Sequence, residues 1–403
     1  MRVDANFYGS VPMRDAGNAG PVPVDRRYGN DAFLGCYDNL ISWAGSLDEL
    51  GYDTMWLTEH HFQYEGYEVV PNLVQFGLFL TTRTERLRAG QMFNVVPQWH
   101  PLRLAEDYAM AQILSNDRMQ FGVGRGTVPR EAQSLGGVVA SGDNEMSREA
   151  DRLNREIFEE SMEIIRLAWT NERFSFTGKH FTLPPPGIPD RGATVTDLTL
   201  VPKPISPVDI WQPVTSPATL EYCPSVRHHG VIPARPPAQV KEIWDRYGEL
   251  AAGHGWELAP GEGRCLALNV HIGRTREDAF RTGRDPHDEW CRFLAPYGRF
   301  RSYANPAGGE TPFDFQPALE DSVDQQIMAI GSVEDVAEAV GMWHELLGME
   351  HLVLFFDMPG ISREAMVEQF HLFADEVMPR AGLEMTRSDV GRGVRTPGPP
   401  DMW

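Results

Sequence analysis

The chain has 403 residues, of which 42% are hydrophobic, and its formal net charge is −21 at pH 7. This composition excludes a disordered chain, and the charge disfavours a nucleic-acid-binding surface, which needs clustered Lys and Arg. The length suits one α/β barrel with insertions, because such barrels often exceed ~250 residues. The N-terminus lacks an apolar signal core, and no run approaches the ~18 apolar residues of a membrane span, so we expect no membrane contact.

The cysteines are widely spaced and include no Cys-x-x-Cys pair. This spacing favours buried, reduced thiols over a zinc site or a disulfide framework, and we expect no metal site and a cytoplasmic protein. The four residues are Cys36, Cys223, Cys265 and Cys291.

Short apolar or β-branched runs alternate with longer amphipathic stretches, a pattern typical of repeated βα units around a parallel sheet. Eight such runs are candidate strands, the number that a closed (β/α)8 TIM barrel needs. In chain order they are Val3–Tyr8, Thr54–Thr58, Leu87–Val95, Met119–Gly124, Val208–Val214, His229–Ile232, Cys265–Ile272 and His351–Asp357. We predict one barrel domain with rim insertions over residues 1–403.

The intervening stretches predict helices, several with recognisable ends. A first helix over Asp38–Leu50 is expected to end at Gly51, a C-cap position. Two capping boxes, with Asp as their last residue, are expected at Thr275 and Ser332. Further predicted helices are Pro101–Leu114, Ser147–Trp169 and Gly331–Gly348.

Two segments interrupt this alternation. Residues 174–207 have no helical period and contain several prolines, so we expect an excursion from the barrel with a hairpin at Phe174–Leu183. Residues 283–326 are rich in aromatic residues and Arg and are too long for an ordinary connection, which predicts a rim insertion. Residues 383–403 form a polar tail rich in Gly and Pro.

The run Glu59-His60-His61-Phe62 directly follows a predicted strand. Residues just past the carboxyl end of a barrel strand face the catalytic mouth. A histidine there can hold or move a proton near neutral pH. Adjacent side chains on an extended segment alternate in direction, so only one of the two histidines is expected to face a given ligand, while both also fit a plain loop.

Two further strand ends are candidate phosphate sites. Arg125 stands in the glycine-rich run Phe121–Gly126, where a guanidinium and backbone N–H groups could hold a phosphate, although a tight turn with a surface arginine fits equally well. The Rossmann glycine spacing is absent. Ser216 opens a helix after the fifth strand, where it could bind phosphate or serve only as an N-cap. The edge Met92–Asn94 is apolar enough to lie under a flat heterocycle, or simply to be a buried strand.

Together these runs resemble the bacterial luciferase family. The likeness is strongest in Gly51–Phe62, in Gln98–Asp107 and in Arg118–Gly126, and it extends through His351–Asp357 to the closing unit Phe370–Pro379. It spans nearly the whole chain apart from the insertions and the tail.

The resemblance implies reduced FMN as a co-substrate, delivered by a separate flavin reductase, and a homodimer. Oxygen would form a hydroperoxyflavin that oxidises an aldehyde, ketone or other apolar organic substrate. The resemblance gives His60 the catalytic position and Arg125 the phosphate. It places Ser216 and Thr219 among phosphate-contacting hydroxyls, although Pro217 replaces the family's alanine there. We expect a neutral imidazole at His60, which could take a proton from, or hydrogen-bond to, the peroxide and the substrate adduct.

The resemblance also matches Met92-Phe93 to a non-proline cis peptide beneath the flavin ring, with Asn94 beside it. Trp290 and Phe293 look like the rim of longer members that perform Baeyer–Villiger oxygenations, and we expect them, with His61, to contact substrate. Two alternatives stay open: a deazaflavin-dependent hydride-transfer enzyme and a non-catalytic flavin-binding protein. The identity of the substrate and any light emission are also open.

Overall fold

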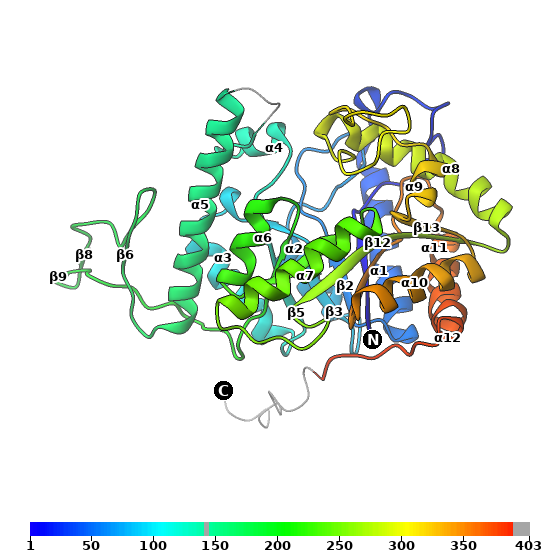
Figure 1. The fold of residues 1–403 in the computed structure, drawn as a ribbon. Helices are drawn as coiled ribbons and strands as arrows, with labels where there is room; N and C mark the ends of the chain where they lie inside the picture. Colours follow the sequence, from blue (N-terminus) through cyan, green and yellow to red (C-terminus); the bar gives the residue numbers. More distant parts are fainter. Residues whose placement is uncertain (141–144, 390–403) are drawn as a thin grey trace.

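The computed structural model describes residues 1–140 and 145–389. Its main sheet closes into a barrel of eight parallel strands, in which β14 pairs with β1 and β5 pairs directly with β10. Helices cover the outside (Figure 1). The predicted (β/α)8 TIM barrel is confirmed. In order around the barrel the strands are β1 (Arg2–Phe7), β2 (Thr54–Leu57), β3 (Arg88–Gln91), β5 (Met119–Gly124), β10 (Ile210–Pro213), β11 (His229–Pro233), β12 (Arg264–Gly273) and β14 (His351–Phe355).

Each predicted strand overlaps one of these strands, because a barrel strand is buried on both faces and therefore appears as a short apolar run. In β1, Val3, Ala5 and Phe7 pack in the core between barrel and helices. The alternate residues Asp4 and Asn6 point to the barrel interior and are fully buried. The predicted third strand is interrupted, and its end forms the two-residue strand β4 (Asn94–Val95).

The helices begin and end close to the predicted positions. α1 begins at Asn30 rather than Asp38 and ends at Gly51, whose φ of 93° is the left-handed C-cap conformation. The helices are α1 (Asn30–Leu50), α2 (Leu73–Thr81), α3 (Pro101–Leu114), α4 (Pro129–Ser134), α5 (Glu145–Thr170), α6 (Pro217–Ser225), α7 (Pro237–Gly253), α8 (Arg276–Leu294), α9 (Leu319–Asp324), α10 (Val333–Leu347), α11 (Arg363–His371) and α12 (Met378–Arg380), with a π-helical segment, Leu372–Val377, before α12.

The capping motifs explain two of these boundaries. The Thr275 side chain accepts a hydrogen bond from the Asp278 N–H at 3.1 Å, and the Ser332 side chain accepts one from the Asp335 N–H at 3.2 Å. The helix predicted from Gly331 therefore begins at Val333. Residues Met328–Ser332 instead form β13, a strand absent from the prediction, which pairs with the carboxyl half of β12.

The excursion at 174–207 leaves the barrel beyond α5 (Figure 1). Its predicted hairpin is present as β6 (Phe176–Thr177) paired with β7 (Thr182–Leu183), and a second hairpin pairs β8 (Pro189–Asp190) with β9 (Ala193–Thr194). The rim stretch from Gly283 begins inside a helix, because α8 continues through Pro286 to Leu294.

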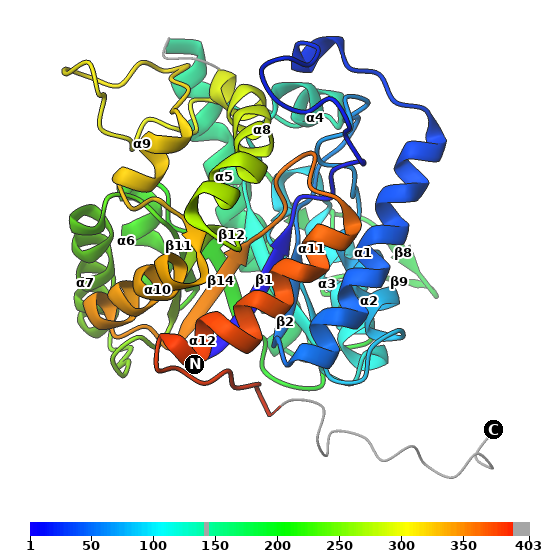
Figure 2. The ribbon, with the colours of Figure 1, turned by 90° about the vertical axis from the view of Figure 1, so that its right-hand side faces the viewer.

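The end of the barrel that holds the strand carboxyl termini is covered by α4, α8 and the segment after β1, opposite the N-terminus (Figure 2). At the N-terminal end, the Thr386 N–H donates to the Met1 carbonyl at 2.9 Å, which attaches the first part of the predicted tail. The rest of that tail, 390–403, lies outside the described residues. Among the helices of the described residues, none has the length and apolar run that a membrane span needs.

Candidate active site

The predicted cofactor and catalytic residues follow four neighbouring strands. β2, β3, β5 and β10 are consecutive around the barrel. His60 follows β2, the Met92–Asn94 edge follows β3, Arg125 follows β5 and Ser216 follows β10. Since the carboxyl ends of parallel strands lie at one end of a barrel, these residues share one mouth.

His60 lies between two buried carboxylates. Its Nδ1 is 3.0 Å from Oε1 of Glu131 in α4, and its Nε2 is 3.1 Å from Oε2 of Glu68 in the loop after β2. Burial opposes the charge on the ring, but the two carboxylates outweigh it and raise the pKa of His60 to about 9. This shift favours the protonated imidazole at pH 7, whereas a neutral ring is expected from the sequence.

Sequence reasoning missed both carboxylates. Glu131 lies 71 residues beyond His60 in the sequence and reaches it only because α4 folds back over the mouth. Gln63 donates to Glu131 at 2.6 Å. Burial alone would raise the pKa of Glu131, but the hydrogen bonds from His60 and Gln63 lower it. The one sequence signal is that Glu131 follows the glycine-rich run by five residues, in a segment that leaves the same barrel end.

His61 turns to a different partner, as the alternation of adjacent side chains predicts. Its Nε2 is 3.0 Å from Glu59 Oε1. The buried Glu59 carboxylate also accepts hydrogen bonds from the Val95 N–H at 2.8 Å and from Trp99 Nε1 at 3.0 Å. Glu59 thus joins His61 to the segment after β3, and the substrate role expected for His61 stays a prediction.

The peptide between Met92 and Phe93 is cis, as the family resemblance implies. Two glycines of β5 lie against it. A Cβ on Gly122 would stand 1.8 Å from the Gln91 carbonyl oxygen, and one on Gly124 would stand 3.1 Å from the Phe93 Cβ. The glycines of the run therefore permit close packing beside this peptide.

Arg125 is engaged by α5. Its Nη1 donates to Asp151 Oδ1 at 2.8 Å and to Asn154 Oδ1 at 3.3 Å. The buried Asn154 amide in turn donates to the Arg125 carbonyl at 3.0 Å. The Arg125 side chain keeps 22% of its surface exposed, so it is oriented by α5 and still reachable by an anion.

Ser216 and Thr219 form the capping box of α6. The Ser216 hydroxyl accepts from the Thr219 N–H at 3.3 Å. The Thr219 hydroxyl accepts from the N–H groups of Thr215 at 3.2 Å and Ser216 at 3.0 Å. The N-cap alternative is thus realised for Ser216, and a phosphate contact by either hydroxyl stays a prediction.

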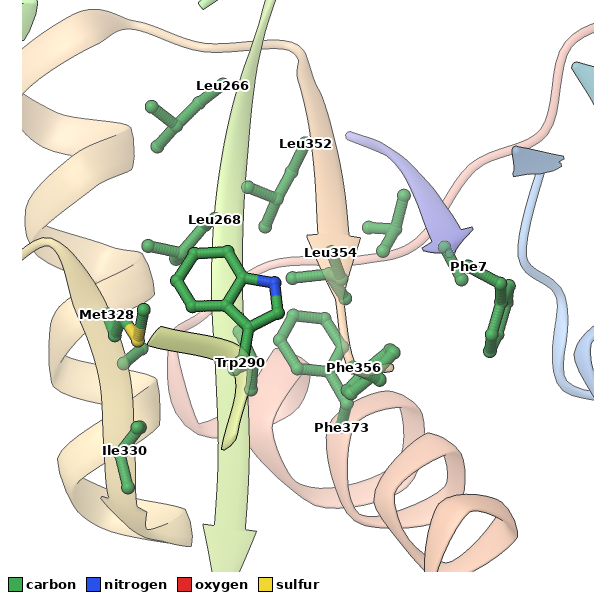
Figure 3. Packing of buried hydrophobic residues seen from close by; sticks show 14 of the residues in the cluster. Phe7, Leu266, Leu268, Trp290, Met328, Ile330, Leu352, Leu354, Phe356 and Phe373 are labelled. Carbon is green, nitrogen blue, oxygen red and sulfur yellow. The ribbon is translucent and has the colours of Figure 1, made fainter. Parts of the chain in front are cut away.

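Trp290 and Phe293, expected at the substrate, belong to the hydrophobic core and are 9% and 8% exposed. Figure 3 shows Trp290 among Leu268, Leu354 and Met328. Phe293 stacks on Tyr67 with ring centroids 4.0 Å apart. These aromatic side chains pack α8 against the barrel, and their contact with substrate stays a prediction.

The barrel interior below the mouth presents buried amides that suit a polar heterocycle. Both amide atoms of Asn6 and the Nδ2 of Asn269 have no hydrogen-bonding partner among the described residues. Asn6 and Asn269 both pair in register with Phe355, so they flank it on adjoining strands. Near the cis peptide, Gln91 Nε2 and Asn94 Oδ1 are also unpartnered within the described residues. Buried amides without partners are costly, and a bound flavin with its ring carbonyl and N–H groups fits them.

Comparisons with known proteins identify the family of the chain. The sequence profile of the family described as "Luciferase-like monooxygenase" matches residues 24–350. The chain is 28% identical over 345 residues to the 4-hydroxyprotoasukamycin monooxygenase of Streptomyces nodosus subsp. asukaensis, covering 85% of each chain. It is 24% identical to the F420-dependent glucose-6-phosphate dehydrogenase of Amycolatopsis mediterranei, over 85% of this chain and 94% of that relative.

Among solved structures, the chain is similar to the oxygenating constituent of 3,6-diketocamphane monooxygenase from the CAM plasmid of Pseudomonas putida, a type II Baeyer–Villiger monooxygenase in complex with FMN. The TM-score is 0.71 at 21% identity, covering 96% of this chain and 100% of that chain. The family profile matches most of the chain and the barrel agrees with it, so this protein is an oxidoreductase that belongs to the luciferase-like monooxygenase family.

Proposed function

We propose that this protein is an FMN-dependent monooxygenase that uses reduced FMN and molecular oxygen to oxidise an aldehyde, ketone or other apolar organic substrate. The observation that carries the proposal is the spatial order of three groups at the carboxyl end of the barrel. Arg125, the Met92–Phe93 peptide and His60 follow three adjoining strands. This order matches an extended ligand with a phosphate at one end and a flat ring at the other.

In this proposal each group has a separate task. Arg125 holds the phosphate by charge-assisted hydrogen bonds, and Ser216 and Thr219 stand at the neighbouring strand end. Met92, Phe93 and Asn94 support the ring, which supplies the two electrons needed to activate oxygen. His60 lies at the next strand end and handles a proton near the reacting oxygen.

We further propose a separate flavin reductase as partner, and a homodimer. The reductase is supported by the name of the Pseudomonas putida structure, an "oxygenating constituent", and by the absence of a Rossmann glycine pattern in the sequence. Purified protein with FMN and NADH or NADPH should turn over poorly until a reductase is added. Rapid NAD(P)H oxidation by this chain alone would contradict the partnership. Light scattering of the purified chain tests the dimer.

Cofactor titration tests the function directly. Under anaerobic conditions, reduced FMN is added to the protein and binding is followed by flavin fluorescence. An oxygen pulse then follows in the presence of candidate aldehydes and ketones, with product and hydrogen peroxide measured. Tight binding of reduced FMN and an oxygenated product support the proposal.

A deazaflavin-dependent hydride transfer is the second candidate. It is favoured by the likeness to the F420-dependent dehydrogenase of Amycolatopsis mediterranei, which extends over 85% of this chain. The same titration separates the two, because a deazaflavin enzyme would bind the F420 cofactor more tightly than FMN. It would also oxidise an alcohol without consuming oxygen.

A further inference from the structure

The starting observation is that each ring nitrogen of His60 faces its own carboxylate. Glu131 lies 3.0 Å from Nδ1 and Glu68 lies 3.1 Å from Nε2. The Glu131 and Glu68 side chains are only 2% and 5% exposed, and His60 is 12% exposed. No Lys or Arg among the described residues forms a salt bridge with either carboxylate. His60 is therefore their counter-ion.

Two buried carboxylates near one imidazole favour its cationic form. An ionised carboxylate without a partner is costly to bury, and a protonated ring can donate to both at once. A neutral imidazole has one N–H, so it would leave one carboxylate facing a lone pair. With both carboxylates ionised, the arrangement of donors and acceptors thus favours an imidazolium.

The other titratable groups near His60, Glu68 and Glu131 come from three further segments, which follow α8, β14 and β1. Arg299, in the segment after α8, opposes protonation of His60. Burial and the nearby Glu131 and Asp357 carboxylates raise the pKa of Glu68, while His60 and Arg299 lower it. Burial raises the pKa of Asp357, after β14, to about 6, although it accepts a hydrogen bond from the Gly9 N–H at 2.9 Å. The Tyr8 hydroxyl, after β1, remains protonated because burial raises its pKa.

We propose that Glu68 and Glu131 are positioning residues that hold His60 as an imidazolium, so that His60 donates a proton during the reaction rather than accepting one. Glu131 fixes the ring through Nδ1. The N–H at Nε2 is shared with Glu68, and an oxygen that gains negative charge in the mouth competes for it. The Nε2–H bond then breaks, an O–H bond forms, and the electron pair remains on Nε2. Water returns the proton afterwards.

The proton donation by His60 rests on the proposed function. The charge of His60 can be measured without flavin or substrate. The full chain is labelled with [15N]histidine, the His60 signals are identified from a His60→Gln variant, and the ring is titrated by NMR without flavin. We expect both ring nitrogens to carry protons at pH 7, with a midpoint near pH 9. A midpoint at or below the ordinary 6.5 overturns the proposal.

Variants of the two carboxylates separate positioning from general structure. Glu131→Gln and Glu68→Gln should each lower the His60 midpoint by about one pH unit or more, because each removes an adjacent negative charge. Glu65→Gln is the matched control, since Glu65 lies in the same loop and pairs with Arg130 at 2.7 Å rather than with His60. The control should leave the midpoint in place. Equal shifts of the His60 midpoint in all three variants, or no shift in Glu131→Gln and Glu68→Gln, would overturn the positioning role of Glu68 and Glu131.

The second readout is coupling at saturating reduced FMN. In the unsubstituted protein the ratio of product to hydrogen peroxide should fall as the pH rises through about 9, and in Glu131→Gln this fall should move to lower pH together with the NMR midpoint. Should Glu131→Gln unfold, Glu131→Asp replaces it and should retain the higher midpoint. A cationic His60 in a protein that forms no product with reduced FMN would refute the proposed function alone. A coupling profile that does not follow the NMR midpoint would refute the proton donation.

Discussion

Arg125 and Asp151 form an ion pair, with Nη1 2.8 Å from Oδ1, at the strand end where the flavin phosphate is proposed to bind. Asp151 belongs to α5 and also accepts from Arg155 at 3.1 Å. The pair orients the guanidinium, and it also places a carboxylate where it competes with a phosphate for the same donors. Substitutions of the two residues are therefore expected to change the affinity for reduced FMN in opposite directions.

Arg125→Ala should weaken binding of reduced FMN by about 1.5–3 kcal/mol, the range for a hydrogen bond to a charged group. Riboflavin lacks the phosphate, so its affinity should hardly change. Anaerobic fluorescence titration of both flavins measures the difference. Equal weakening of the two would contradict the phosphate assignment.

Asp151→Asn should tighten reduced FMN binding by roughly 0.3–1 kcal/mol, because it removes a partly exposed anion beside Arg125. Asp197→Asn is a control, since Asp197 pairs with Arg173 in the excursion at 2.7 Å and does not contact the mouth. The measurement is the dissociation constant at low and high salt. Weaker binding in Asp151→Asn would mean that orienting Arg125 matters more than the competing charge.

His60→Ala should bind reduced FMN almost normally yet lose product, with oxygen diverted to hydrogen peroxide, because acid–base groups typically contribute about 10²–10⁴-fold. His61→Ala should affect coupling less and stability more, since His61 contacts the buried Glu59 at 3.0 Å. The product-to-peroxide ratio of the two variants decides between them. A coupled His60→Ala together with an uncoupled His61→Ala would reverse the roles.

The stability of the fold should depend on pH through His60. Its pKa is about 9 in the folded protein and about 6.5 when unfolded, so the interaction stabilises fully below pH 6.5 and is lost as the pH rises through about 9. The stability advantage over His60→Gln should therefore shrink by about 2–3 kcal/mol between pH 6.5 and 10. Urea unfolding at fixed pH values measures it. A constant difference across this range would argue against a cationic ring.

Arg26→Met should destabilise the protein by less than the ~3–5 kcal/mol that a buried charge left without a partner costs, because Glu289 keeps Arg292 at 3.4 Å and the Gly17 N–H at 2.8 Å. Arg26 donates to Glu289 at 2.9 Å, and their side chains are 2% and 0% exposed. This contact ties the segment after β1 to α8. The double variant with Glu289→Met should be less destabilised than Arg26→Met, as chemical unfolding would measure. Strictly additive losses would contradict coupling between the two side chains.

The sequence by itself determined the barrel and the strand ends that the candidate site residues follow. Strands buried on both faces leave short apolar runs, and the Ser332 and Thr275 caps leave local signals, so each could be predicted from a few neighbouring residues. His60 and Arg125 could be singled out because each follows the carboxyl end of such a strand, whereas the Met92–Phe93 cis peptide was predicted from the family resemblance. β13 was missed because its pairing with β12, rather than its own short run, makes it a strand.

The tertiary structure alone decided the partners of these residues. Glu131 contacts His60 although the two residues are 71 positions apart in the sequence, and Arg26 contacts Glu289 at a separation of 263 positions. Neither periodicity nor motif spacing carries information over such sequence separations. The composition of residues 283–326 predicts an insertion, but it does not show that α8 continues through Pro286 or that Trp290 and Phe293 pack in the core. The charge of His60 likewise depends on which carboxylates burial brings beside it, so the sequence locates the histidine and the fold decides its protonation.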